Sequence, residues 1–166
     1  MKKSNKLDIV YEDKWLIVAN KPSHMLTIST DNEKEKTLFH QVLMYEKRKN
    51  KNNKVFIVHR LDKDTSGLVL FAKDEKIKIK LQNTWDKDTK RGYIAIVHGK
   101  TLDKETLKSY LAETKTLLVY STNDSNKGKL AITSYEKIKE NNRLTLLKIN
   151  ILTGRKNQIR VQLNDN

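Results

Sequence analysis

The chain of 166 residues contains no cysteine, one proline and five glycines. Without cysteine it forms no disulfide bond and offers no thiolate ligand for zinc, and we expect a cytoplasmic protein. No apolar run approaches the ~18 residues that cross a bilayer, and no signal-peptide pattern opens the chain, so we expect no membrane partner. The length suits a single domain over residues 1–166.

Positive charge dominates what the sequence does contain, with 34 Lys and Arg against 20 Asp and Glu and a formal net charge of +14. A surface of this kind attracts polyanions and binds them in a salt-dependent way. The alternative is a compositional bias, because lysine and asparagine are abundant throughout the chain and form the run 47–54. The charge by itself leaves both explanations open.

The hydrophobic pattern predicts two helices among many short strands. One helix starts after Thr37, with Leu38 and Val42 on its apolar face, and a second covers 74–86 behind Asp74. Residues 103–113 suit either a helical turn or an irregular strand. The fold class is therefore α+β, with a mixed, largely antiparallel sheet and flanking helices. Strands are predicted at 8–11, 15–19, 55–59, 67–73, 92–98, 116–121, 130–138, 143–152 and 158–163.

The densest group of reactive side chains lies at 59–66, between two apolar strands. A loop that follows a buried strand is a common way to hold reactive groups on a rigid base. Asp62 lies between Arg60 and Lys63, whose charges favour an ionised, nucleophilic carboxylate. The alternative is a charged hairpin turn completed by Gly67, and the local pattern alone favours that turn.

Residues 58–68, Val-His-Arg-Leu-Asp-Lys-Asp-Thr-Ser-Gly-Leu, resemble the central motif of the RluA-type pseudouridine synthases, His-Arg-Leu-Asp-x-x-Thr-Ser-Gly. Further segments resemble other motifs of this family, in the family's order along the chain. They are Asn-Lys-Pro at 20–22, Tyr-x-Ala-x-Val-x-Gly at 93–99, Lys-x-Ala-x-Thr-x-Tyr at 129–135 and Thr-Gly-Arg-x-x-Gln-Ile-Arg-Val at 153–161. The resemblance implies the catalytic domain of a pseudouridine synthase.

The resemblance also implies catalytic roles for three residues. Asp62 is the expected nucleophile, and Arg160 is expected to form an ion pair with it, from one face of the predicted strand 158–163. Without the resemblance, Arg160 suits a phosphate contact or a surface charge. Tyr93 is the expected platform on which the target uracil stacks, and the alternative is a tyrosine that fills the core.

Five further residues are expected to contact the RNA. A cationic side chain at His59 or Arg60 would fill the gap left by the flipped base, unless these residues only brace the loop. Lys21, Arg155 and Gln158 are candidate phosphate or base contacts.

The implied reaction is an isomerisation, which breaks the N1–C1′ bond of uridine and rejoins the uracil through C5. It needs a carboxylate and a water-poor pocket, so we expect no cofactor and no metal. The expected partner of this RNA-modifying enzyme is a stem-loop in large-subunit rRNA or tRNA, and we expect a monomer.

The sequence departs from the family pattern within two motifs and at its two ends. His24 follows Lys-Pro-Ser where a glycine is usual, and Asn157 replaces a common histidine. We expect the C-terminal part of the domain to be missing after Asn166, and no accessory RNA-binding domain at the N-terminus.

Two rival functions are a non-catalytic RNA-binding module and a glycosidase-like hydrolase that uses Asp62 and Asp64, although these carboxylates lie too close in one loop to oppose each other.

Overall fold

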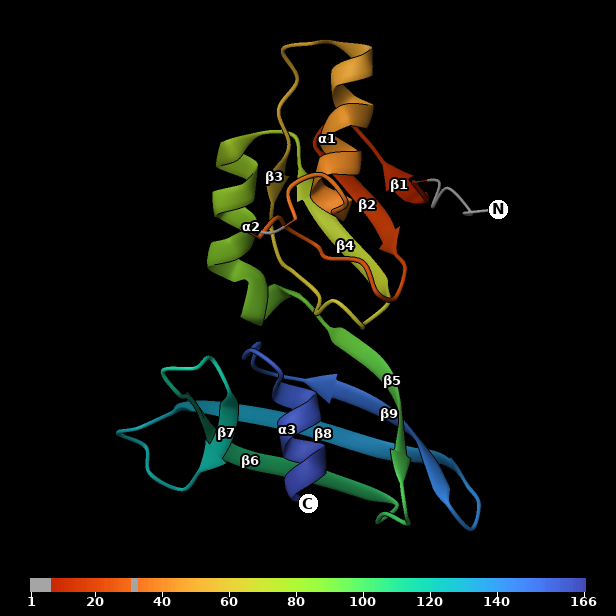
Figure 1. The fold of residues 1–166 in the computed structure, drawn as a ribbon, viewed down its shortest axis with the longest axis vertical. Helices are drawn as coiled ribbons and strands as arrows, with labels where there is room; N and C mark the ends of the chain where they lie inside the picture. Colours follow the sequence, from red (N-terminus) through yellow and green to blue (C-terminus); the bar gives the residue numbers. More distant parts are fainter. Residues whose placement is uncertain (1–6, 31–32) are drawn as a thin grey trace. The chain divides into compact units, whose positions relative to one another are not determined.

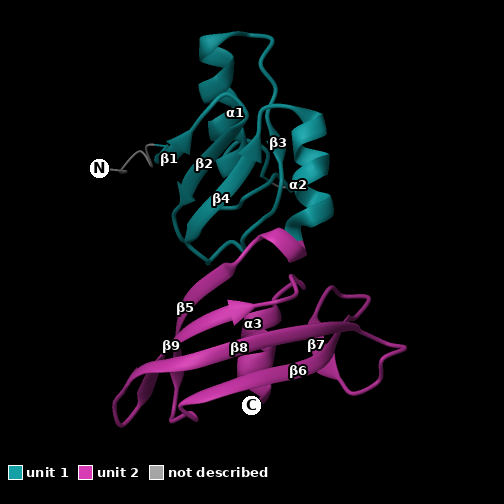
Figure 2. Ribbon diagram, turned by 180° about the vertical axis from the view of Figure 1, so that it is seen from behind, with its two compact units in different colours: residues 1–85 teal, residues 86–166 magenta. Residues whose placement is uncertain are grey.

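A computed structural model describes residues 7–30 and 33–166, and within them the chain forms three helices and nine strands. The fold is α+β and all strand pairs within its sheets are antiparallel, which confirms the predicted class. By its contacts the chain divides into two compact units, 1–85 and 86–166 (Figure 2). That the two units act as one catalytic domain stays a prediction.

The first unit contains a four-stranded sheet of order β1-β2-β4-β3 (Figure 1). The two central strands supply its core, because Ile17, Ala19, Val69 and Phe71 are fully buried and alternate with less buried neighbours. The elements of this unit are β1 (Ile9–Glu12), β2 (Leu16–Lys21), α1 (Leu38–Lys49), β3 (Phe56–Ile57), β4 (Gly67–Ala72) and most of α2 (Glu75–Asp88), whose last residues belong to the second unit.

The predicted starts of both helices are confirmed. Thr37 is the N-cap of α1, and its hydroxyl accepts a hydrogen bond from the His40 amide at 3.1 Å. The carboxylate of Asp74 accepts from the amides of Lys76 and Ile77 at the start of α2, at 2.8 and 3.2 Å. Both helices therefore begin where a side-chain oxygen can satisfy amides that have no partner within the helix.

The second unit contains a five-stranded antiparallel sheet of order β5-β9-β8-β6-β7. Its core cluster is Leu107, Tyr135, Leu147 and Ile149. A short helix, α3 (Gln158–Asp165), lies across one face of this sheet (Figure 1). The strands are β5 (Arg91–His98), β6 (Lys104–Glu113), β7 (Val119–Thr122), β8 (Lys129–Glu140) and β9 (Leu144–Ile151).

The strand predicted at 158–163 is wrong, because these residues form α3. Ile159 and Leu163 lie one helical turn apart and pack against the core cluster, while Gln158 and Gln162 repeat the same spacing and are buried. A six-residue pattern of alternating polar and apolar residues therefore fitted a helix as well as a strand. Residues 103–113, which left both options open, contain the strand β6.

No helix among the described residues is long and apolar enough to span a membrane.

Candidate active site

The loop between β3 and β4 carries Asp62 in a half-buried position. Leu61, the residue before it, is 8% exposed and belongs to the core. After Asp62 the chain turns back, with the Thr65 amide donating to the Asp62 carbonyl at 3.2 Å. Gly67 then begins β4 with a φ of +132°, a conformation that side chains rarely adopt. The loop thus fixes Asp62 between a buried leucine and a tight return into the sheet.

The segment that follows β2 holds the loop on both sides of Asp62. The Thr27 hydroxyl donates to the Leu61 carbonyl at 2.8 Å and accepts from the Leu61 amide at 3.2 Å. On the other side, the Ser23 hydroxyl donates to the Asp64 carbonyl at 2.8 Å. Sequence reasoning missed Thr27 and Ser23, since nothing in the local pattern shows that these hydroxyls reach residues more than thirty positions away.

Lys21 is a third brace of the same loop. Its side chain is 0% exposed, and its ammonium donates to the carbonyls of Met25, Lys63 and Pro22 at 2.7, 3.0 and 3.1 Å. Burial lowers the pKa of Lys21, while the negative charges of Asp64 and Asp62 act to raise it. The expected phosphate contact does not fit this position, because the ammonium has no exposed surface and its three donors are used.

His24 occupies the position where the family pattern has glycine, and its φ is +62°. The left-handed conformation explains why glycine suits this position, and it costs a histidine some free energy. The His24 Nδ1 lies 3.0 Å from an Asp64 carboxylate oxygen, with side chains 82% and 63% exposed. A contact this exposed contributes little to stability.

His59 and Arg60 differ in their surroundings. The Nε2 of His59 accepts a hydrogen bond from the Leu70 amide at 3.1 Å, so this nitrogen carries no proton in the structure. The ring also stacks on Trp85, with centroids 4.6 Å apart. These contacts brace the loop against β4 and α2, and the RNA contact expected of His59 stays a prediction. Arg60 is exposed, and its role in filling a vacated base stack stays a prediction.

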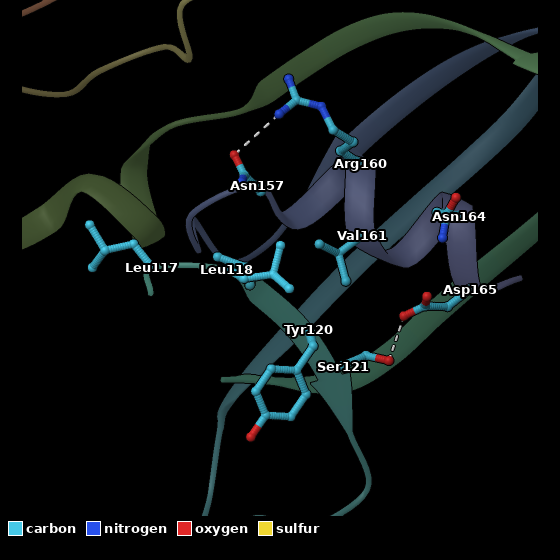
Figure 3. A pocket seen from close by; sticks show the side chains of 10 residues that line it. Leu117, Leu118, Tyr120, Ser121, Asn157, Arg160, Val161, Asn164 and Asp165 are labelled. Atoms are coloured by element: carbon cyan, nitrogen blue, oxygen red, sulfur yellow. Dashed lines mark hydrogen bonds between the residues drawn. The ribbon is translucent and has the colours of Figure 1, made fainter. Parts of the chain in front are cut away.

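Tyr93 and Arg160 belong to the second unit. Tyr93, on β5, packs partly buried against the same core cluster as Ile159 and Leu163, so it lies on the sheet face that α3 covers. Arg160 is exposed on α3, and its guanidinium donates to the Asn157 side chain at 3.3 Å (Figure 3). The stacking role of Tyr93 and the ion pair between Arg160 and Asp62 stay predictions.

Gln158 is 3% exposed, and both ends of its amide are used inside the protein. Its nitrogen donates to the Ile132 carbonyl and the Thr133 hydroxyl at 3.1 and 2.9 Å. Its oxygen accepts from the Thr153 hydroxyl and the Arg155 amide at 2.8 and 3.0 Å. The expected RNA contact does not fit Gln158, which instead ties the 153–155 turn to β8.

Arg155 is half-buried, and its Nε donates to the Leu130 carbonyl at 3.0 Å. This bond uses one of the five donors of the guanidinium, so the RNA contact expected of Arg155 stays a prediction.

Arg91 is a further residue at this turn that sequence reasoning missed. Its guanidinium donates to the Leu152 carbonyl at 2.7 Å and lies 2.8 Å from the Asp86 carboxylate. A Cβ on Gly154 would lie 2.6 Å from an Arg91 nitrogen, so glycine leaves room for this close approach. The turn before α3 is therefore fixed from β5 and β8 together.

A pocket of about 450 Å³ lies beside Arg160, between α3 and the segment that leads into β7 (Figure 3). It combines apolar side chains with two amides, two hydroxyls, a guanidinium and a carboxylate. Its lining residues are Leu117, Leu118, Val119, Tyr120, Ser121, Asn157, Arg160, Val161, Asn164 and Asp165. Among the described residues, no group of three or more His, Asp or Glu side chains is placed to hold a metal ion.

Comparison with known families agrees with the motif order and with this fold. The chain matches the family described as RNA pseudouridylate synthase over residues 15–165, and it belongs to that family.

Two curated relatives illustrate the similarity. The chain is 35% identical over 161 residues to an uncharacterized RNA pseudouridine synthase of Mycoplasma genitalium, covering 95% of this chain and 51% of that protein. It is 38% identical to the ribosomal large subunit pseudouridine synthase C of Rickettsia prowazekii, covering 92% and 50%. The chain thus spans about half the length of the curated relatives it matches.

A solved structure supports the fold. The human RNA pseudouridylate synthase domain containing 4 aligns with a TM-score of 0.78 and 22% identity, covering 95% of this chain and 64% of that chain. This likeness extends to both units of the chain, and it concerns the fold alone.

Proposed function

We propose that this chain isomerises uridine to pseudouridine in structured RNA, with Asp62 as the nucleophile. The observation that carries the proposal is the bracing of the loop on both sides of this aspartate, by Thr27 before it and by Lys21 and Ser23 after it. A reaction is faster when its nucleophile is already held in the attacking geometry. The entropy cost of positioning the nucleophile is then met during folding and does not add to the barrier of the reaction.

The bracing also weakens the alternative of a simple charged turn. A hairpin turn at the surface needs only its own hydrogen bonds and solvent. Here a lysine is buried at 0% exposure to hold the Lys63 carbonyl, next to the residue that the motif assigns to catalysis. Burying an ammonium costs free energy, so its presence supports a loop whose exact shape matters.

The proposed chemistry leaves the composition of the nucleoside unchanged. The bond between C1′ and N1 breaks, the uracil turns, and a bond forms between C1′ and C5. N1 gains a proton and C5 loses one to solvent. Asp62 acts as the nucleophile, and the bond that its carboxylate forms with the nucleoside breaks again before the product is released. Arg160 orients and stabilises this carboxylate, and Tyr93 stacks on the uracil. Arg60 fills the space that the flipped nucleotide leaves in the RNA helix.

The relatives' names suggest where to look for the substrate. The Rickettsia relative is named a ribosomal large subunit pseudouridine synthase, so large-subunit rRNA is the first substrate to test, and tRNA the second. The net charge of +14 supports a polyanionic partner in either case. A monomer in the cytoplasm is part of the same proposal.

The deciding experiment measures tritium release from RNA labelled at C5 of uridine, using the protein at its full natural length. We expect release by the wild type and by Asp64→Ala, and none by Asp62→Ala. Asp64 is the matched control because it lies in the same loop and its exposed carboxylate contacts the exposed side chain of His24. Binding without release would favour the non-catalytic module, and free uracil in the supernatant would indicate the hydrolase.

A further inference from the structure

The end of α1 and the turn that follows it concentrate positive charge in the first unit. Between Glu46 and Asp62 the sequence contains no acidic residue. Four basic side chains of this stretch lie at the surface, and among the described residues none of the four has an ion pair. We call this group the basic turn, and its members are Lys47, Arg48, Lys51 and Lys54.

The carboxylates at this end of α1 are engaged by other cations. Glu46 is 3% exposed, and its carboxylate lies 2.6 and 3.6 Å from the ammonium groups of Lys49 and Lys73. The same two ammonium groups also contact the carboxylate of Glu12. Two negative charges therefore meet two positive charges within this cluster, which leaves the four charges of the basic turn without an offset.

Hydrogen bonds fix the shape of the turn that presents these charges. The Asn50 amide donates to the Glu46 carbonyl at 3.2 Å, and the Asn53 amide donates to the Asn50 carbonyl at 2.9 Å. The Asn53 side chain also donates to the carbonyl and to the carboxylate of Glu46, at 3.3 and 2.9 Å. The backbone that carries Lys51 and Lys54 is therefore held in place, which reduces the entropy lost when a ligand binds.

The C-terminal end of a helix favours basic side chains, and this explains part of the pattern. Lys47 and Arg48 lie in the last turn of α1, where the partial negative charge of the helix end stabilises them. Lys51 and Lys54 follow the end of α1 at Lys49, and the effect of the helix dipole fades within one turn. The helix end alone therefore does not account for these two positions.

The basic turn and the Asp62 loop both belong to the first unit, where they lie at opposite ends of one segment. Residues 54–60 contain β3 and connect the two (Figure 1). At about 3.3 Å per residue, this segment spans at most ~20 Å. An RNA held at the Asp62 loop therefore reaches the basic turn if its stem extends over about this distance.

We propose that the basic turn binds the phosphate backbone of the substrate RNA, on the stem and away from the target uridine. Exposed ammonium and guanidinium groups bind phosphate oxygens without reading the base sequence. A base would need an aromatic surface for stacking, and residues 47–54 contain no aromatic side chain. The inference rests on the proposed function for the identity of the RNA.

The test measures how RNA affinity depends on salt, with the protein at its full natural length. The probe is the stem-loop, transcribed from large-subunit rRNA or tRNA, that the wild type retains most tightly on a filter at ~0.15 M salt. The variant combines Lys47→Gln, Arg48→Gln, Lys51→Gln and Lys54→Gln. We expect its Kd at this salt concentration to rise about 100-fold. The slope of log Kd against log salt should fall by about 3, because each lost phosphate contact removes roughly 0.7 to 0.9.

A control variant removes the same charge from exposed positions in four separate segments. It combines Lys34→Gln, Lys100→Gln, Lys115→Gln and Lys139→Gln. We expect its slope to fall by less than about 1. Equal losses in the two variants would overturn the proposal, because the overall charge would then set the affinity.

A second variant keeps the charge of the basic turn and separates binding from folding. It combines Lys47→Arg, Arg48→Lys, Lys51→Arg and Lys54→Arg, and it should bind the probe within about 3-fold of the wild type. A loss of affinity as large as that of the glutamine variant would overturn the proposal, because the shape of the turn rather than its charge would then matter.

A probe whose stem is cut back to the base pairs nearest the loop tests the position of the contact. The wild type and the glutamine variant should bind this short probe within about 2-fold of each other. A difference as large as on the complete stem would contradict a contact away from the target. A wild type that shows the steep salt dependence but releases no tritium would refute the proposed function and leave the basic turn assigned to RNA. Tritium release with an unchanged slope in the glutamine variant would refute this inference alone.

Discussion

Lys21 in the first unit and Gln158 in the second each lie close to a residue assigned to catalysis. Lys21 binds the carbonyl of Lys63, which follows Asp62, and Gln158 lies two residues before Arg160. Both were expected to touch RNA, and both are instead buried, at 0% and 3% exposure. Each uses its polar atoms to tie a loop to another part of its own unit. The residues assigned to catalysis, Asp62 and Arg160, are half-buried and exposed. A polar residue within a motif can therefore hold the backbone rather than face the solvent.

Lys21 carries a charge and Gln158 does not, so we expect the largest loss of stability and activity when Lys21 is replaced. Lys21→Met removes a buried ammonium and leaves three carbonyls unpaired, so we expect about 3–5 kcal/mol less stability and a large loss of tritium release. Urea denaturation measures the stability. Lys36→Met, whose side chain is 88% exposed in the wild type, is the control and should change neither quantity. An active, fully stable Lys21→Met variant would contradict the bracing role.

A partly buried ion cluster lies in the first unit, where three donors hold the carboxylate of Glu12. Burial acts to raise the pKa of Glu12, but hydrogen bonds from Lys49, Lys73 and Tyr45 outweigh it and lower the pKa to about 2. The lowered pKa contributes stability that is fully present above pH ~4.5 and is lost as the pH falls towards 2, about 3 kcal/mol in all.

Hydrogen exchange between pH 5 and 3 can test this cluster. We expect protection to fall in β1, α1 and β4 and to fall less in the second unit, with the difference reduced in Glu12→Gln. Uniform loss of protection across both units would count against the cluster as the cause.

The neutral brace should have a smaller effect than the charged one. Gln158→Ala leaves the Ile132 carbonyl and the Arg155 amide without this partner, so we expect about 2 kcal/mol less stability. Activity should fall through kcat, since the α3 turn that presents Arg160 loosens, while the control Asn142→Ala stays at wild-type values. A rise in KM alone would instead indicate that Gln158 touches RNA after all.

The smallest effect concerns the loop that Lys21 holds. His24→Gly relieves a left-handed conformation and should add up to about 1 kcal/mol of stability, less the weak contact with Asp64. A melting curve measures the change, and Ser29→Gly at an exposed position should lower the melting temperature slightly or leave it unchanged. A melting temperature that falls in His24→Gly would mean that the His24–Asp64 contact outweighs the strain.

Much of the fold followed from local patterns in the sequence. The helix caps Thr37 and Asp74 and the alternation of most strands depend only on residues close together in the sequence. Cap chemistry and hydrophobic periodicity could therefore predict them. The helix α3 was missed because its six-residue pattern satisfies two periods, and the burial of Ile159 against the sheet decides between them. The braces of the Asp62 loop could not be predicted either, since Thr27 and Leu61 meet only after the sheet has formed.

We propose above all that Asp62 is the nucleophile of the isomerisation and that its braced loop holds it in position. Single-turnover tritium release by Asp62→Asn tests this claim most directly, because asparagine keeps the size and the hydrogen-bonding reach of the side chain but lacks the charge. We expect no measurable release by Asp62→Asn, with a fold, stability and RNA affinity close to those of the wild type. Release at a substantial fraction of the wild-type rate would contradict it.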